Sequence, residues 1–266
     1  MTNGPQTHGP CLRHSGFVIP SDFVICHSSF SAPFSAPRFN MMPARQIRAV
    51  TFDVGGTLIR PWPSVGHVYA EVAARHGLKN VSPDALNKNF AAAWREKKNF
   101  QHTKEGWANL VDTTFAGLCE PPPRRTLFPA IYRRFAEADA WRIYDDVLAT
   151  LEALASKDIP LAVISNWDER LRPLLRQLRL DRFFETMVVS CEVGFAKPSS
   201  VIFDHAAKML RLQPEQILHV GDSANEDLAG AESAGFQALL IDRDKTAVDA
   251  ARIASLRRLE KFLFPD

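Results

Sequence analysis

The sequence predicts an α/β protein with a Rossmann-like parallel sheet core and an inserted all-helical cap domain. Short, continuously apolar segments alternate with helical patterns in the second half of the chain, which is typical of a parallel sheet covered on both faces. Residues 64–137, in contrast, show helical patterns throughout. We therefore expect an α/β core from residues 47–60 and 141–266, and a helical cap from residues 61–140.

The elements follow from these patterns in chain order. Five buried strands are expected at residues 49–52, 161–165, 187–190, 217–221 and 238–241. Helices between the later strands are expected near residues 145–157, 169–179, 200–210, 224–234 and 246–261. Cap helices are expected at residues 65–76, 83–98, 104–118 and 124–137. A helical insertion after the first strand would cover the carboxyl edge of the sheet, where ligands of open α/β sheets bind.

The first 46 residues differ from the rest of the chain. They contain six of the 18 prolines and show no helical or strand period. Three arginines and one acid give them the composition of some organelle-targeting peptides. Met41 and Met42 directly precede the first strand, so we favour a disordered leader or a mis-assigned start over a targeting role.

Composition excludes several classes of protein. Of 266 residues, 46% are hydrophobic, and 32 Lys and Arg nearly balance 30 Asp and Glu. No excess of cations exists to neutralise nucleic-acid phosphates, and no apolar run reaches the roughly 20 residues of a membrane-spanning helix. Four cysteines without a C-x-x-C pair indicate neither a disulfide framework nor a zinc site. We expect a cytoplasmic location and neither a nucleic-acid nor a membrane partner; the oligomeric state stays open.

Polar side chains at four strand ends suit phosphoryl transfer. The carboxylate of Asp53 can attack phosphorus and form an aspartyl-phosphate, which divides one difficult step into two. Attack by an anion on an anion needs charge relief, which Mg²⁺ provides. Candidate metal ligands are Asp53 and Asp222, with Asp227 as a ligand or an orienting group. Lys197 can neutralise the phosphoryl oxygens, and Ser165 can donate a hydrogen bond to them.

The turn after the first strand can bring the backbone close to a ligand. Gly55 and Gly56 permit that approach, and the amides of residues 55–57 can donate to phosphoryl oxygens. Taken singly, each of these polar residues also has a structural explanation. An Asp that ends a strand forms turns or caps helices, and Ser223 with Glu226 forms a capping box. The order of the four groups together favours the functional interpretation.

These residues resemble the four motifs of the haloacid dehalogenase superfamily. The motifs are Asp53-x-x-Gly-Thr-Leu, Ser165-Asn166, Lys197-Pro198 and Gly-Asp222-Ser-x-x-x-Asp227-x-x-Gly-Ala-x-x-Ala-Gly. The resemblance covers about residues 47–266, and the helical insertion resembles the type-one cap of the family. It implies a nucleophile at Asp53, which is also a Mg²⁺ ligand, with Asp222 and the carbonyl of Gly55 as further ligands. It also implies that Ser165 and Lys197 hold the phosphoryl group, with Gly56 and Asn166 beside the substrate.

One position departs from the family pattern. Phosphatases of the family normally carry a second Asp two residues after the nucleophile, where it protonates the leaving oxygen and then activates water; here Gly55 stands there. General acid–base catalysis contributes about 10²–10⁴-fold. We therefore expect slow turnover, with a larger loss for alkyl phosphates than for aryl or acyl phosphates. His67, near the start of the first cap helix, is a candidate replacement donor.

Four functions stay open. The favoured one is a Mg²⁺-dependent phosphohydrolase that acts on a small phosphorylated metabolite. A dehalogenase also lacks the second Asp, but without a cation the carboxylates of Asp222 and Asp227 would repel that of Asp53. A phosphonatase would use a cap lysine, although Lys97 and Lys98 are typical of a solvated face. The fourth function is a non-catalytic phosphate-binding or interaction protein.

The sequence leaves the substrate open. Four tryptophans are candidate stacking platforms for it, although core packing is the favoured role for such residues. They are Trp62, Trp94, Trp107 and Trp141.

Overall fold

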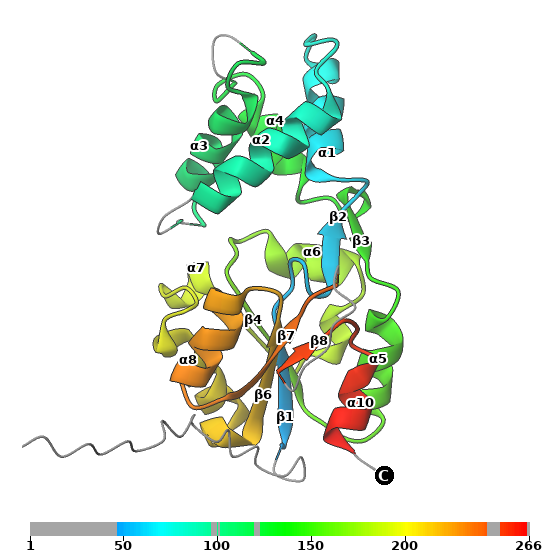
Figure 1. The fold of residues 1–266 in the computed structure, drawn as a ribbon, viewed down its shortest axis with the longest axis vertical. Coiled ribbons are helices and arrows are strands. Elements are labelled where there is room, and N and C mark those ends of the chain that lie inside the picture. The colour runs from blue at the N-terminus through cyan, green and yellow to red at the C-terminus, as the bar shows by residue number, and fades with distance from the viewer. Residues whose placement is uncertain (1–46, 97–99, 101, 120–122, 244–250, 265–266) are drawn as a thin grey trace, which may run out of the picture. The chain divides into compact units, whose positions relative to one another are not determined.

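The computed structural model describes residues 47–266, apart from residues 97–99, 101, 120–122, 244–250 and 265–266 (Figure 1). The predictions for the leader and for Lys97 and Lys98 lie outside these described residues.

A six-stranded parallel sheet forms the core, in the order β5-β4-β1-β6-β7-β8. The strands are β1 (Ala49–Phe52), β4 (Leu161–Ser165), β5 (Thr186–Val189), β6 (Ile217–Gly221), β7 (Gln237–Ile241) and β8 (Arg252–Ile253). Every residue of β1, β4 and β6 is buried, as expected for strands covered on both faces. The predicted α/β fold with a parallel sheet is therefore confirmed.

Helices pack on both faces of this sheet. They are α5 (Val147–Ala155), α6 (Leu171–Gln177), α7 (Ser190–Val193), α8 (Ser200–Leu210), α9 (Gly230–Ser233) and α10 (Arg258–Leu263). One buried cluster joins the sheet to α5, α6 and α10, and a second joins it to α8 and α9. The neighbours Val163 and Ile164 belong to different clusters because successive side chains of a strand point to opposite faces.

The C-terminal segment corrects one prediction. Instead of a continuous helix over residues 246–261, residues 252–253 form β8, and helix α10 begins at Arg258. Strand β8 pairs with β7 through Leu240 and Ile241, which adds a sixth strand to the five expected. A two-residue strand is too short for its period to be visible in a sequence. The helix expected at 224–234 is a π-helical segment (Ala224–Ala229) followed by α9.

Residues 62–140 lie between two short antiparallel strands, β2 (Ile59–Pro61) and β3 (Trp141–Ile143), and we call them the helical insert. It contains α1 (Val65–Arg75), α2 (Pro83–Glu96), α3 (Lys104–Phe115) and α4 (Phe128–Arg134). These helices share their own buried cluster, which includes Tyr69, Leu86 and Phe115. Strands β2 and β3 were not predicted, because three residues are again too few to show a period.

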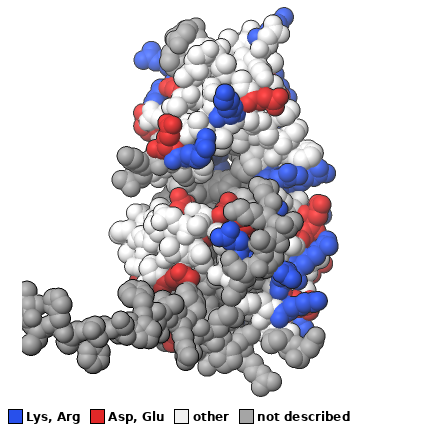
Figure 2. All heavy atoms as spheres, in the orientation of Figure 1, with Lys and Arg blue, Asp and Glu red and all other residues white. Residues whose placement is uncertain are grey.

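Within the described ranges, no helix has both the length and the apolar character needed to cross a membrane. Positive and negative side chains are interspersed on the face shown in Figure 2.

Candidate active site at the carboxyl edge of the sheet

The ends of the neighbouring strands β1 and β4 bring two of the predicted polar residues to one edge of the sheet. Strand β1 runs directly into Asp53, and β4 beside it ends at Ser165. The hydroxyl of Ser165 donates to Oδ1 of Asp53 at 3.0 Å, and Nζ of Lys197 donates to the same oxygen at 2.7 Å. The three side chains are buried. One carboxylate oxygen is therefore held by two donors from different parts of the chain.

Lys197 connects two carboxylates. Besides Asp53, its ammonium donates to Oδ1 of Asp227 at 2.5 Å and to the carbonyl of Ile164 at 2.9 Å. Burial alone would lower the pKa of Lys197, but the negative charges of Asp227 and Asp53 outweigh burial and raise it. The ammonium is therefore charged throughout the physiological pH range.

A buried histidine supports Asp227. Nε2 of His219 lies 3.1 Å from Oδ1 of Asp227, and its Nδ1 lies 2.9 Å from Oγ1 of Thr51. Burial lowers the pKa of His219, so the ring is neutral and Nε2–H is the donor to the carboxylate. The amide of Ser223 donates to the other oxygen of Asp227 at 2.9 Å. His219 was not predicted as a site residue. Its position within an otherwise apolar strand is the feature of the sequence that could have indicated it.

Three carboxylates gather at this edge. Asp53, Asp222 and Asp227 each offer an oxygen, and these atoms lie within 4.8 Å of one another. Lys197 and the neutral His219 leave an excess of negative charge. Burial, followed by the charges of Asp53 and Asp227, raises the pKa of Asp222 to about 8, although its side chain is exposed and lines a cavity. Oxygen ligands and unbalanced negative charge suit Mg²⁺, so the residues present fit this ion.

The glycine turn after β1 allows a close approach to this cluster. Gly56 has φ = +78°, and a Cβ atom there would lie 2.2 Å from Oδ2 of Asp222, so only glycine fits. The amide of Gly56 donates to the carbonyl of Ile59 at 2.9 Å, so this N–H group is already used within the turn. Gly55 and Gly56 both line the cavity.

Asn166 binds the backbone of Lys197. Its Oδ1 accepts from the backbone amide of Lys197 at 2.7 Å, and its Nδ2 donates to the carbonyl of Lys197 at 2.9 Å. Nδ2 also lies 3.1 Å from Oε2 of Glu226. Asn166 lines the cavity, but its amide is already bonded to the loop that carries the ammonium.

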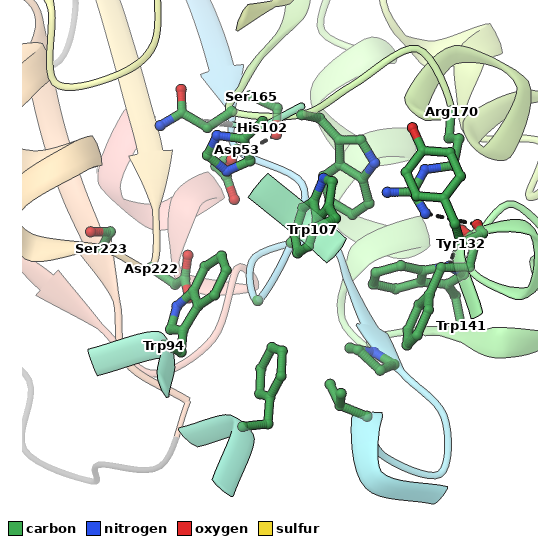
Figure 3. A pocket seen from close by; sticks show the side chains of 18 of the residues that line it. Asp53, Trp94, His102, Trp107, Tyr132, Trp141, Ser165, Arg170, Asp222 and Ser223 are labelled. Atoms are coloured by element: carbon green, nitrogen blue, oxygen red, sulfur yellow. Dashed lines mark hydrogen bonds between the residues drawn. The ribbon is translucent and has the colours of Figure 1, made fainter. Parts of the chain in front are cut away.

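A cavity of about 400 Å³ extends from these residues into the helical insert. Three of the four tryptophans singled out in the sequence line it, namely Trp94, Trp107 and Trp141 (Figure 3). The fourth, Trp62, is 37% exposed, and the guanidinium carbon of Arg142 lies 4.1 Å from the centroid of its ring.

The histidine predicted as a replacement acid does not line this cavity. His67 lies at the start of α1, where its Nδ1 is 2.8 Å from the hydroxyl of Ser64. His102, just before α3, lines the cavity instead, together with Asp53. Neither a motif nor a period in the sequence distinguished His102 from the other histidines.

The chain belongs to the haloacid dehalogenase-like hydrolase family, whose model matches residues 47–235. Haloacid dehalogenase-like hydrolase domain-containing protein 3 of Xenopus laevis is 31% identical over 206 residues, which are 73% of this chain and 84% of that protein. The family resemblance inferred from the four motifs is thereby confirmed.

Solved structures share the fold. The HAD-hydrolase YfnB from Bacillus subtilis, bound to magnesium, aligns with a TM-score of 0.68 at 18% identity, over 82% of this chain and 98% of that one. A 2-haloacid dehalogenase from Pseudomonas syringae pv. Tomato aligns with a TM-score of 0.56 at 26% identity, with the same coverage.

Proposed function

We propose that the protein is a Mg²⁺-dependent phosphohydrolase that forms an aspartyl-phosphate on Asp53. The observation that carries this proposal is the bonding of Asp53, whose Oδ1 accepts from Ser165 at 3.0 Å and from Lys197 at 2.7 Å. These donors fix the orientation of a carboxylate that lines a cavity able to admit a small substrate. In this proposal, residues 61–140 act as a cap over the α/β core of residues 47–60 and 141–266.

The reaction runs in two steps. In the first, a carboxylate oxygen of Asp53 bonds to phosphorus while the bond from phosphorus to the leaving oxygen breaks, and the leaving oxygen keeps the electron pair. In the second, water attacks phosphorus, the aspartyl oxygen departs, and inorganic phosphate is released. Lys197 and Ser165 stabilise negative charge on the transferred group in both steps.

The other site residues divide between metal binding and positioning. Asp53, Asp222 and the carbonyl of Gly55 would hold Mg²⁺, which when bound supplies charge relief for an anionic nucleophile and an anionic substrate. Asp227 accepts from Lys197, His219 and Ser223, which supports its role as the orienting group rather than as a metal ligand. Asn166 positions the backbone of Lys197.

A dehalogenase is the second candidate, because Gly55 supplies no acid and dehalogenases are among the structures with this fold. Without a metal, however, the carboxylate of Asp222 adds to the negative charge around Asp53. This charge would oppose a metal-free reaction of a haloacid anion.

The test is Mg²⁺-dependent phosphate release from a panel of aryl, acyl and alkyl phosphates, with Asp53→Asn as the control. We expect turnover that requires both Mg²⁺ and Asp53. No release from any substrate, or release that Asp53→Asn leaves unchanged, contradicts the proposal. Capture of beryllofluoride without turnover would support a binding protein, and halide release without metal would support a dehalogenase.

A further inference from the structure

Gly55 and Trp167 set the surroundings of the leaving group. A Cβ atom at residue 55 would lie 3.1 Å from Cζ3 of the Trp167 indole. The side of the turn where a residue-55 side chain would project is therefore covered by an aromatic ring. Both residues line the cavity that contains Asp53, so a substrate attached to phosphorus there would meet an indole instead of a carboxyl group.

Aromatic rings continue from this point into the helical insert. The ring of Trp141 lies 5.2 Å from that of Trp167, and Phe135 packs edge-on against Trp141 at 5.6 Å. On α2 and α3, Trp94 and Trp107 are stacked, with an interplanar angle of 15° and centroids 6.0 Å apart. Figure 3 shows Trp94, Trp107 and Trp141 around the same hollow as Asp53 and Asp222. Such flat walls bind flat, apolar groups.

The charge in this part of the cavity is already balanced. Among the described residues that line it, Arg170 is the one Lys or Arg. Its guanidinium donates to both oxygens of Asp168, at 2.9 and 2.6 Å, and to the carbonyl of Tyr132 at 2.9 Å. It also lies 3.6 Å from the centroid of the Tyr132 ring. A second anionic group on the substrate would find no available cation among these residues, so a neutral group fits best.

Two buried indole donors belong to residues in the wall of this cavity. The indole N–H groups of Trp107 and Trp167 are buried and have no hydrogen-bond partner within the described part of the chain. Both residues line the cavity, and the side chain of Trp167 is only 9% exposed. An unpaired buried donor is unfavourable, so a neutral acceptor that reached either N–H group on binding would be stabilised.

We propose that the substrate is an aryl phosphate, the phosphate monoester of a phenol, whose neutral aromatic body lies between these rings. This inference rests on the proposed phosphohydrolase function and deepens it. The cavity of about 400 Å³ lies near the lower end of the range for small-molecule sites, which suits one body of two fused rings.

The chemistry of such a substrate agrees with the missing acid. Asp53 bonds to phosphorus, the bond from phosphorus to the aryl oxygen breaks, and the phenolate leaves with the electron pair. A phenol has a pKa of about 10, whereas bulk water, a guide to aliphatic alcohols, has a pKa of about 15.7. The phenolate can therefore depart unprotonated and take a proton from solvent afterwards, which makes an acid at residue 55 dispensable.

The test compares kcat/KM for 2-naphthyl phosphate, ethyl phosphate and acetyl phosphate in the full chain with Mg²⁺. Acetyl phosphate also needs no acid but has no ring. We expect Trp107→Leu to lower kcat/KM for 2-naphthyl phosphate about tenfold, mainly through KM, since stacking is lost. It should change kcat/KM for acetyl phosphate less than about twofold. Trp62→Leu, outside the cavity, is the matched control and should leave both values unchanged.

A second variant separates the ring from the donor. Trp107→Phe keeps an aromatic ring but removes the N–H group, so 2-naphthyl phosphate should retain its kcat/KM within about twofold. Equal losses for naphthyl and acetyl phosphate in Trp107→Leu, or no preference of the unaltered protein for naphthyl over ethyl phosphate, would overturn the aryl assignment. Failure to hydrolyse even acetyl phosphate would instead overturn the proposed function itself.

Discussion

Nε2 of His219 lies 3.1 Å from the oxygen of Asp227 that also accepts from Lys197. The histidine is fully buried in β6, and its neutral ring donates to a carboxylate that would otherwise depend on the lysine and one backbone amide. A residue that does not line the cavity therefore helps to fix the ammonium beside Asp53.

Replacing His219 should weaken this arrangement. A hydrogen bond to a charged group contributes about 1.5–3 kcal/mol, so His219→Leu should lower the free energy of unfolding by about that amount. For acetyl phosphate, kcat should fall by a larger factor than the factor by which KM changes, because Lys197 is held less firmly. Urea unfolding and steady-state kinetics measure the two effects. Unchanged stability and kcat would show that Asp227 does not need this donor.

Stability without metal should depend on pH through Asp222. The pKa of this carboxyl is raised from 3.8 to about 8 in the folded protein, so the folded state holds the proton more tightly than the unfolded state does. Its contribution to stability is fully present below pH 4 and is lost as the pH rises through 8. Because water screens an exposed side chain, the effect should be modest.

Thermal unfolding with and without Mg²⁺ tests this dependence. The Tm in EDTA should fall between pH 5 and pH 8, and Mg²⁺ should raise it more at pH 8, where a larger fraction of Asp222 is ionised. Asp222→Asn should reduce both effects. A Mg²⁺ effect of equal size at both pH values, or one that Asp222→Asn leaves intact, would contradict the metal assignment.

An acid restored at position 55 should raise the turnover of ethyl phosphate. Because the new side chain would press on Trp167, Gly55→Asp alone should act weakly, and Gly55→Asp with Trp167→Leu should act more strongly. The gain should be a fraction of the 10²–10⁴-fold that acid–base catalysis provides. The matched control is Gly55→Asn with Trp167→Leu, because an Asn side chain has the size of Asp but cannot act as an acid. If ethyl phosphate responds equally to both pairs, the missing acid is not what limits the reaction.

His102 should matter for substrates with poor leaving groups. It is the histidine among the described residues that line the cavity, and it lies in the helical insert. If it donates a proton, His102→Gln should lower kcat for ethyl phosphate at least tenfold more than kcat for 2-naphthyl phosphate. An equal change for the two substrates would assign His102 to packing against Phe100 and Trp107.

The grouping of Asp53, Ser165 and Lys197 could be expected from the sequence, because parallel strands end at one edge and the motifs follow those ends. The short strands β2, β3 and β8 could not, since they have only two or three residues each. The aromatic wall of the cavity could not be expected from the sequence either. Trp107 lies on α3 and Trp167 in the loop after β4, and only tertiary contacts bring them to the same space.

The aspartyl-phosphate proposed on Asp53 is tested most directly by rapid quenching of the protein during turnover of 2-naphthyl phosphate, followed by mass spectrometry of its peptides. Because Gly55 supplies no base for the second step, the covalent intermediate should accumulate and naphthol should appear in a burst. We expect one Mg²⁺-dependent phosphoryl group on the peptide that contains Asp53, absent from Asp53→Asn. Steady phosphate release without a phosphoryl group on that peptide would contradict it.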